Sequence, residues 1–165
     1  MLHQAIYDIS GPVAVRYPRG GESEWKEDCS MGASICLREG SDITLVGYGT
    51  MIQTLLKTAD QLSEKGIRAE VVKLNTITPI DASMIVNSVR KTGRVLVAED
   101  SVDMNCVGRR VVSALLDAGV NPKAVALQNL GKGFVSHGSV AQLKKLCSLD
   151  SNSLCAKAEE VCARG

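Results

Sequence analysis

A chain of 165 residues is long enough for one domain, and a domain of this size buries roughly 70% of its extended-chain surface without a staple. Its 45% hydrophobic and 22% charged residues are typical of a soluble globular protein. With 19 basic and 18 acidic residues the formal net charge is +1, too small to attract nucleic acid or anionic lipid over a distance. We therefore expect no nucleic-acid partner. No apolar run approaches the ~18–20 residues that cross a bilayer, so we expect no membrane span either.

The first residues predict a short helix that Gly11 and Pro12 end. This start lacks the basic flank and apolar stretch of a signal peptide. Val13–Tyr17 predicts a strand, which Pro18 and Gly20 end. Because the lead-in opens without a helix cap, we interpret it as the end of a preceding domain.

A short strand over Ala33–Arg38 is followed by a turn at Glu39–Gly40 and a second strand over Ile43–Gly47. Such a turn is too short for a crossover connection between parallel strands. We therefore expect these two strands to pair with each other in an antiparallel manner.

From there, strands alternate with helices of about ten to fifteen residues. Further strands are predicted over Ala69–Leu74, Arg94–Ala98 and Ala124–Gln128. Helices are predicted from Thr50 to Lys65, Ala82 to Lys91, Val107 to Ala118, Ser139 to Leu146, and from Asp150 or Ser151 onward. The candidate N-caps are Thr50, Asp81 and Ser139, and the glycines that end helices are Gly66, Gly93 and Gly119. This alternation calls for right-handed crossovers. The fold class is α/β: a three-layer αβα domain with a mixed, mostly parallel five-stranded sheet.

Six cysteines occur without a CxxC motif or a Cys/His cluster: Cys29, Cys36, Cys106, Cys147, Cys155 and Cys162. Several fall inside apolar helical patterns. We interpret them as reduced, buried thiols of a cytoplasmic protein, with no metal site. Cys155 and Cys162 lie seven residues apart on a predicted helix and should share a face without being bonded.

The turn Gly47–Thr50 joins a strand to a helix N-terminus, where free backbone N–H groups can bind phosphate. It lacks the third glycine of a dinucleotide fingerprint and the lysine of a P-loop, which favours a structural turn. Asp81 precedes a helix, so capping is preferred to acid catalysis.

Glu99 and Asp100 end a buried strand, where open α/β sheets collect ligands. Without a partner base or metal ligand they are either interface contacts or a polar edge. His137 stands between Ser136 and Gly138 at the entry to a helix, which favours a loop-fixing hydrogen bond over catalysis.

Two arginines end the first predicted strand in the segment Arg16–Gly20, with proline and glycine holding the turn. Guanidinium groups at such a place suit bidentate capture of a phosphate or carboxylate. A surface ion pair is the equal alternative from chemistry alone.

The segment Gly11–Gly20, GPVAVRYPRG, resembles the GP-x-A-x-RYPRG segment of the 1-deoxy-D-xylulose-5-phosphate synthase family. The resemblance continues in order through four further segments: Gly47–Thr50, Thr78–Asp81 (family KPLD), Val97–Asp100 (family TVEE) and Phe134–Ser139 (family FIxHG), with Leu149–Asp150 matching its GLD. It covers nearly the whole chain. RYPRG also occurs in E1β subunits of 2-oxoacid dehydrogenases, but the closing motifs favour the synthase.

The resemblance implies an enzyme of three domains that dimerises and condenses pyruvate with glyceraldehyde 3-phosphate, losing CO2, with thiamine diphosphate and Mg2+. The product feeds isoprenoid and thiamine biosynthesis. The cofactor motifs of the family, such as GDG…N, are absent from this sequence. The chain thus resembles a transketolase C-terminal domain (22–165) after the tail of a pyrimidine-binding domain (1–21), a fragment that is not catalytic alone. Its partners are the missing N-terminal domains and a second copy of the enzyme.

In the family the second arginine of RYPRG contacts the sugar phosphate, a role that carries over to Arg19. Two departures stand out: Met104–Gly108 replaces the family's GGxG, and Thr78 replaces a lysine. A neighbouring transketolase-family enzyme and an E1β subunit remain alternatives. So does a free-standing module that binds a nucleotide at Gly47–Thr50.

Overall fold

The computed structural model describes residues 2–15 and 32–164. The chain separates into two compact units, Met1–Ser30 and Met31–Gly165, which we treat individually. In the first unit, helix α1 spans Leu2–Tyr7 and buries no residue. The predicted strand at Val13–Tyr17 is wrong for residues 13–15, which pair with no described strand; the remainder lies outside the described residues.

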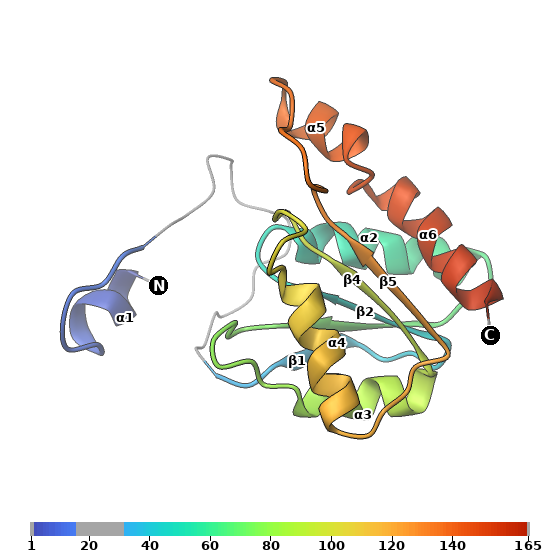
Figure 1. The fold of residues 1–165 in the computed structure, drawn as a ribbon, viewed down its shortest axis with the longest axis horizontal. Helices are drawn as coiled ribbons and strands as arrows, with labels where there is room; N and C mark the ends of the chain where they lie inside the picture. Colours follow the sequence, from blue (N-terminus) through green and yellow to red (C-terminus); the bar gives the residue numbers. More distant parts are fainter. Residues whose placement is uncertain (1, 16–31, 165) are drawn as a thin grey trace. The chain divides into compact units, whose positions relative to one another are not determined.

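The second unit is built around a five-stranded sheet in the order β1-β3-β2-β4-β5 (Figure 1). Its strands are β1 (Ile35–Arg38), β2 (Ile43–Gly47), β3 (Ala69–Lys73), β4 (Arg94–Ala98) and β5 (Ala124–Gln128). Its helices are α2 (Met51–Glu64), α3 (Ser83–Thr92), α4 (Val107–Asp117), α5 (Val140–Leu146) and α6 (Ser151–Ala163). β2 to β5 are parallel and β1 is antiparallel to β3. The predicted mixed sheet is confirmed.

Alternate residues of the strands contribute to two separate hydrophobic cores, because successive side chains point to opposite faces of a sheet. Leu45 of β2 packs under α2 and α6, whereas Val46 packs against α3 and α4. β2 is buried at every position, as expected of a central parallel strand covered on both faces. The three-layer αβα arrangement is therefore confirmed.

The predicted pairing of the first two strands is wrong. β1 pairs with β3, and β2 lies on the other side of β3. The connection crosses the start of β3, where the amides of Ser41 and Asp42 both donate to the Arg68 carbonyl oxygen at 3.0 Å. Gly40 lies so close to β3 that an added Cβ would be 2.2 Å from the Glu70 nitrogen. The short connection between β1 and β2 therefore fixes the direction of β1 relative to β2, but not which strand β1 pairs with.

Most predicted helix ends are confirmed. Gly93 and Gly119 have φ of 71° and 68°, the left-handed conformation that glycine adopts without strain. Ser139 and Gln142 form a capping box, and the Asp150 side chain accepts from the amides of Asn152 and Ser153.

The predicted cap at Thr50 is wrong. Its side chain caps nothing, because the first amides of α2 are taken by the backbone: Met51 N donates to the Tyr48 oxygen and Ile52 N to the Gly49 oxygen. The Thr50 hydroxyl donates instead to Asp100 Oδ2 at 3.3 Å.

The five cysteines among the described residues are free thiols, as predicted, but only Cys106 and Cys155 are buried; Cys29 lies outside the described residues. Cys155 and Cys162 both pack on the core from α6 and are not bonded. None of the helices in the described ranges is both long and apolar enough to cross a lipid bilayer.

Candidate functional site

The carboxyl ends of β2 and β4 form the topological switch point of the sheet. The chain runs from β2 outward to β3 and then returns to place β4 on the other side of β2. In open α/β sheets this is where ligands bind. The loops that meet here are Gly47–Thr50 after β2 and Glu99–Ser101 after β4. The sequence singled out both loops, and the structure brings them together.

Glu99 is the centre of this edge and is only 1% exposed. Its Oε1 accepts from the amide of Gly108 at 2.8 Å, and its Oε2 accepts from the amide of Val107 at 3.0 Å. The carboxylate thus satisfies the first two amides of α4, where the helix dipole also favours a negative charge. Of the two interpretations left open for Glu99, the structure supports neither an interface contact nor a polar edge: it is a buried anchor for α4.

Two hydroxyl groups complete the shell of Glu99. The Ser101 hydroxyl donates to Oε2 at 2.8 Å and the Tyr48 hydroxyl donates to the same oxygen at 3.1 Å. Burial, together with the Glu99 charge, raises the pKa of Tyr48 from 10.0 to about 12. A carboxylate with four donors has little capacity left for acid–base chemistry, so this cluster closes the switch point instead of opening it to a ligand.

The remaining predicted residues of this edge have structural roles as well. The Tyr48 and Gly49 carbonyl oxygens of the turn accept from the first amides of α2, which supports the interpretation as a structural turn. Asp81 Oδ1 accepts from the Ser83 amide at 3.1 Å, and Oδ2 accepts from the Ser34 amide at 3.0 Å. Hydrogen bonds from Ser83 and Ser34 lower the pKa of Asp81. The predicted capping role is therefore confirmed, one residue before the N-cap position Ala82.

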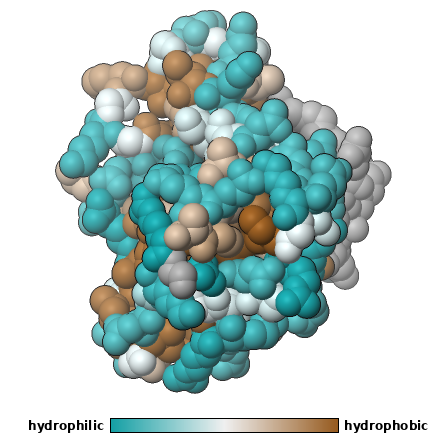
Figure 2. Space-filling model, turned by 90° about the vertical axis from the view of Figure 1, so that its right-hand side faces the viewer, coloured by the Kyte–Doolittle hydropathy of each residue, from teal (hydrophilic) through white to brown (hydrophobic). Residues whose placement is uncertain are grey.

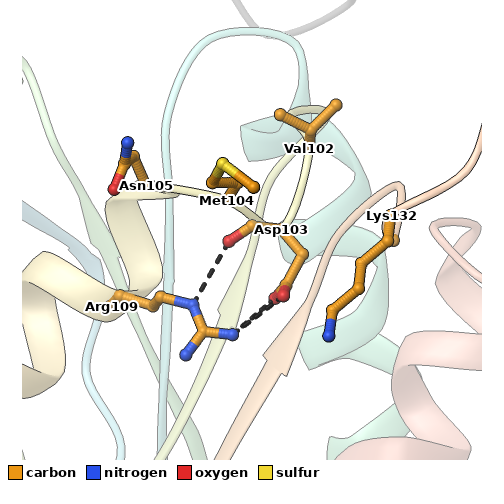
Figure 3. Close-up of a pocket in the computed structure, with 7 residues that line it drawn as sticks. Val102, Asp103, Met104, Asn105, Arg109 and Lys132 are labelled. Carbon is orange, nitrogen blue, oxygen red and sulfur yellow. Dashed lines mark hydrogen bonds and ion pairs between the residues drawn. The ribbon is translucent and has the colours of Figure 1, made fainter.

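The structure also forms a hollow that the sequence did not predict, although Met104 and Asn105 belong to the segment that departs from the family's GGxG. A hollow of about 600 Å³ lies outside the carboxyl ends of β4 and β5 (Figure 3). It is lined by Val102, Asp103, Met104, Asn105, Arg109, Gly131 and Lys132. Arg109 Nη2 donates to both carboxylate oxygens of Asp103, at 3.0 and 2.8 Å. This pair lowers the pKa of Asp103, and Lys132 lies beside it. No spacing in the sequence indicated that two different loops would build this hollow.

The segment Met104–Gly108 departs from the family's GGxG motif, but its last residue, Gly108, still allows the backbone to approach its neighbours closely. An added Cβ at Gly108 would lie 2.8 Å from Leu127 Cδ2 and 3.2 Å from Glu99 Oε1. The close backbone approach is therefore present at this one glycine, while Asn105 takes a left-handed turn with φ of 57°. Thr78, the second departure, accepts a hydrogen bond from Arg110 Nη1 at 3.1 Å.

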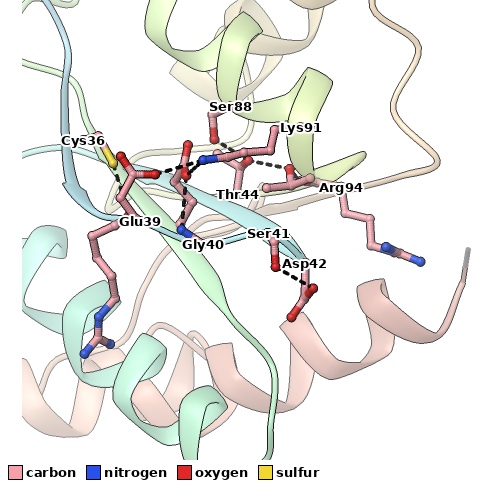
Figure 4. Close-up of polar contacts among 12 residues, drawn as sticks. Cys36, Glu39, Gly40, Ser41, Asp42, Thr44, Ser88, Lys91 and Arg94 are labelled. Atoms are coloured by element: carbon pink, nitrogen blue, oxygen red, sulfur yellow. Dashed lines mark hydrogen bonds and ion pairs between the residues drawn. The ribbon is translucent and has the colours of Figure 1, made fainter.

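Cys36, Glu39 and Glu70 form the one group of three potential metal ligands among the described residues, with ligand atoms within 4.8 Å of one another. The Lys91 ammonium already lies among them and donates to Glu70 and, at 3.0 Å, to Glu39 (Figure 4). Burial alone would raise the pKa of Glu70, but hydrogen bonds from Lys91, Ser88 and Gly40 outweigh it and lower that pKa. The lysine supplies the positive charge that a cation would bring, so the group is a partly buried cluster of ion pairs.

His137 and Arg19 are the last two predicted residues. His137 is exposed in the loop before α5, and among the described residues it makes no hydrogen bond of the kind we expected. Arg19 lies outside the described residues.

Residues 32–154 match the family model of the transketolase C-terminal domain. The chain is 37% identical over 144 residues to 1-deoxy-D-xylulose-5-phosphate synthase of Desulforudis audaxviator, a match that covers 84% of this chain and 23% of that protein. It is 34% identical over 166 residues to the synthase of Heliobacterium modesticaldum, covering 98% of this chain and 25% of that protein. The chain therefore spans about a quarter of the length of the curated relatives it matches.

Solved structures give the same fold. A structure described as "Split gene transketolase, inactive beta4 tetramer" matches 81% of this chain and 43% of its own, with a TM-score of 0.70 and 28% identity. A transketolase mutant from Pichia stipitis matches with a TM-score of 0.57 at 17% identity, covering 79% of this chain and 18% of its own. The second likeness concerns the fold alone.

Proposed function

This chain belongs to the transketolase C-terminal domain family, and from that premise we propose that it is the C-terminal domain of a 1-deoxy-D-xylulose-5-phosphate synthase. The complete enzyme condenses pyruvate with glyceraldehyde 3-phosphate and releases CO2, making a precursor of isoprenoids and thiamine. The observation that carries this proposal is the match to a synthase over 98% of the chain.

The described residues do not fit thiamine diphosphate and Mg2+. Mg2+ requires an octahedral set of oxygen ligands, whereas the Cys36–Glu39–Glu70 group contains a thiol and already holds Lys91. The amides that begin α4 are bonded to Glu99, which leaves them unavailable to a phosphate. We infer that the rest of the enzyme binds the cofactor, which supplies the carbanion chemistry there.

In this proposal the chain contributes substrate anchoring and packing, and is inactive alone. Residues 1–21 are the tail of the pyrimidine-binding domain, and Arg19 within them binds the phosphate of the aldehyde substrate. A guanidinium group suits this role because it presents a planar fork of donors to phosphate oxygens. We further infer that the complete enzyme is a cytoplasmic homodimer.

The test is a chimeric synthase: the Heliobacterium modesticaldum enzyme with its matching quarter replaced by this chain. We expect it to convert pyruvate and glyceraldehyde 3-phosphate to 1-deoxy-D-xylulose 5-phosphate with release of CO2. The same enzyme with that quarter deleted is the control and should form no product. A folded chimera that binds thiamine diphosphate but forms no product would contradict the proposal.

A second candidate is a subunit of a transketolase proper, which the TM-score of 0.70 to the split-gene transketolase favours. Transketolases act on ketose phosphates, so the donor substrate separates the two candidates. If this chain restored turnover of a ketose phosphate to a transketolase whose C-terminal part it replaced, while the synthase chimera formed no product, the transketolase assignment would be correct. Restored turnover of pyruvate alone in a 2-oxoacid dehydrogenase whose E1β C-terminal part it replaced would instead indicate the E1β alternative.

A further inference from the structure

Large apolar side chains gather, exposed, at one end of the second unit. Phe134, the chain's one phenylalanine, is fully exposed, with a relative accessibility of 109%. Val140 and Leu146 of α5 are 72% and 65% exposed. We call these three residues the apolar end. Figure 2 shows apolar atoms at the top of the view, the end that α5 and the preceding loop occupy in Figure 1.

Hydrogen bonds hold the apolar end in place, although no residue of α5 is buried. The capping box of Ser139 starts the helix, and Lys144 Nζ donates to Thr54 Oγ1 of α2 at 3.1 Å. Gln128 Nε2 of β5 donates to the Cys147 oxygen at 3.0 Å. The loop before α5 is tied to the loop after β4, since the Leu130 amide donates to the Ser101 oxygen at 2.9 Å. The apolar side chains are thus presented on an ordered support.

The segment of chain that carries the apolar end has charged residues of one sign only. Residues 129–148 include Lys132, Lys144 and Lys145 and contain no aspartate or glutamate, in a chain whose net charge is only +1. Contiguous exposed apolar residues with a polar rim mark interaction surfaces. The basic rim indicates a partner whose facing surface is apolar with an acidic border.

We propose that the apolar end is the surface on which this domain docks against the catalytic part of its own enzyme, an inference that rests on the proposed function. About three quarters of the relatives' length lies outside the part that this chain matches, which is ample for a partner surface. A second copy fits less well. In a two-fold interface the same patch meets itself, which would bring the lysines of residues 129–148 against each other.

Hydrogen exchange in the chimeric synthase tests this docking. Amides of residues 130–146 should exchange at least tenfold more slowly in the chimera than in the isolated chain. The loop of residues 118–123, which precedes β5 and so lies at the amino ends of the strands, serves as the internal reference and should exchange alike in both. The double variant Phe134→Ser/Val140→Ser should lose the protection. Leu116→Ser, at a residue 55% exposed near the other end of α4, is the matched control and should keep it.

The outcomes separate the two proposals. A chimera that forms product while residues 130–146 exchange as fast as in the isolated chain overturns the docking surface and leaves the proposed function intact. Protection that survives in Phe134→Ser/Val140→Ser overturns it as well. A folded chimera that shows protection but forms no product supports the docking and contradicts the synthase assignment; one with neither contradicts both.

Discussion

The carboxylate of Glu99 accepts a hydrogen bond of 2.8 Å from the amide of Gly108 and thereby joins the end of β4 to the start of α4. Because the Glu99 carboxylate is buried, its removal leaves the amides of Val107 and Gly108 in α4 without a hydrogen-bond partner. An unsatisfied buried donor costs about 1–3 kcal/mol. We therefore predict that Glu99→Ala lowers the free energy of unfolding by roughly 3 kcal/mol or more.

Urea denaturation of Glu99→Ala and Glu99→Gln is the measurement. The glutamine keeps one acceptor oxygen, so its loss should be smaller, about 1–2 kcal/mol. Asp100→Asn is the control, since Asp100 is exposed and should change stability by less than about 0.5 kcal/mol. If Glu99→Ala unfolded within 0.5 kcal/mol of the wild type, about the spread of neutral surface substitutions, the anchoring role of Glu99 would be refuted.

A second prediction concerns Lys91, whose ammonium lies against Glu70. The Glu70 side chain is 4% exposed and that of Lys91 is 44% exposed. Lys91→Met leaves a buried carboxylate without its cation, which we expect to destabilise the protein at pH 7 by about 1–2 kcal/mol, a value reduced for the partial exposure of the lysine.

The pH dependence of this loss has a definite sign. The folded state lowers the pKa of Glu70 from 4.5, so its stabilisation is present above that pH and is lost as the pH falls through the folded-state value. The difference between wild type and Lys91→Met should therefore be greatest near neutrality and shrink in acid. Glu39→Gln, at a side chain 83% exposed, is the control and should have little effect. A difference that stays constant down to pH 3 would rule out the linkage.

Tyr48 provides a third prediction, at alkaline pH. Its pKa is raised from 10.0 to about 12, so the folded state keeps a proton that the unfolded state releases near pH 10. Stability from this group is complete below pH 10 and decreases as the pH rises toward 12. Ultraviolet titration of phenolate should show one tyrosine ionising near pH 12, and Tyr48→Phe should remove that step. If the same late step persisted in Tyr48→Phe, the assignment to Tyr48 would be wrong.

Much of the fold could be predicted because local signals and tertiary structure agree here. The strand Arg94–Ala98 was predicted with its observed bounds, since four consecutive apolar residues follow a helix-ending glycine. The pairing of Ile35–Arg38 could not be predicted. A turn of this length fits either neighbour, and the choice depends on contacts of residues 40–42 with Arg68 and Glu70, which are distant in the sequence.

The candidate site was less accessible to sequence reasoning. Glu99 was singled out by its place at a strand end, but its role depends on amides eight and nine residues further along, which a sequence pattern does not specify. The hollow beside Arg109 lies between the loop after β4 and the loop after β5. The exposure of apolar side chains could not be predicted from the sequence either. Phe134 and Val135 are consecutive apolar residues, a pattern that fits a buried segment as well as an exposed one.

The central claim, that this chain anchors the sugar phosphate while the chemistry takes place elsewhere in the enzyme, is tested most directly at Arg19. A charge-assisted pair contributes about 1.5–3 kcal/mol. In the chimeric synthase, Arg19→Ala should therefore raise KM for glyceraldehyde 3-phosphate roughly ten- to a hundredfold and leave KM for pyruvate unchanged, while Arg19→Lys recovers only part of the loss. If Arg19→Ala instead lowered the melting temperature and left KM for the aldehyde phosphate as it was, the claim would be contradicted.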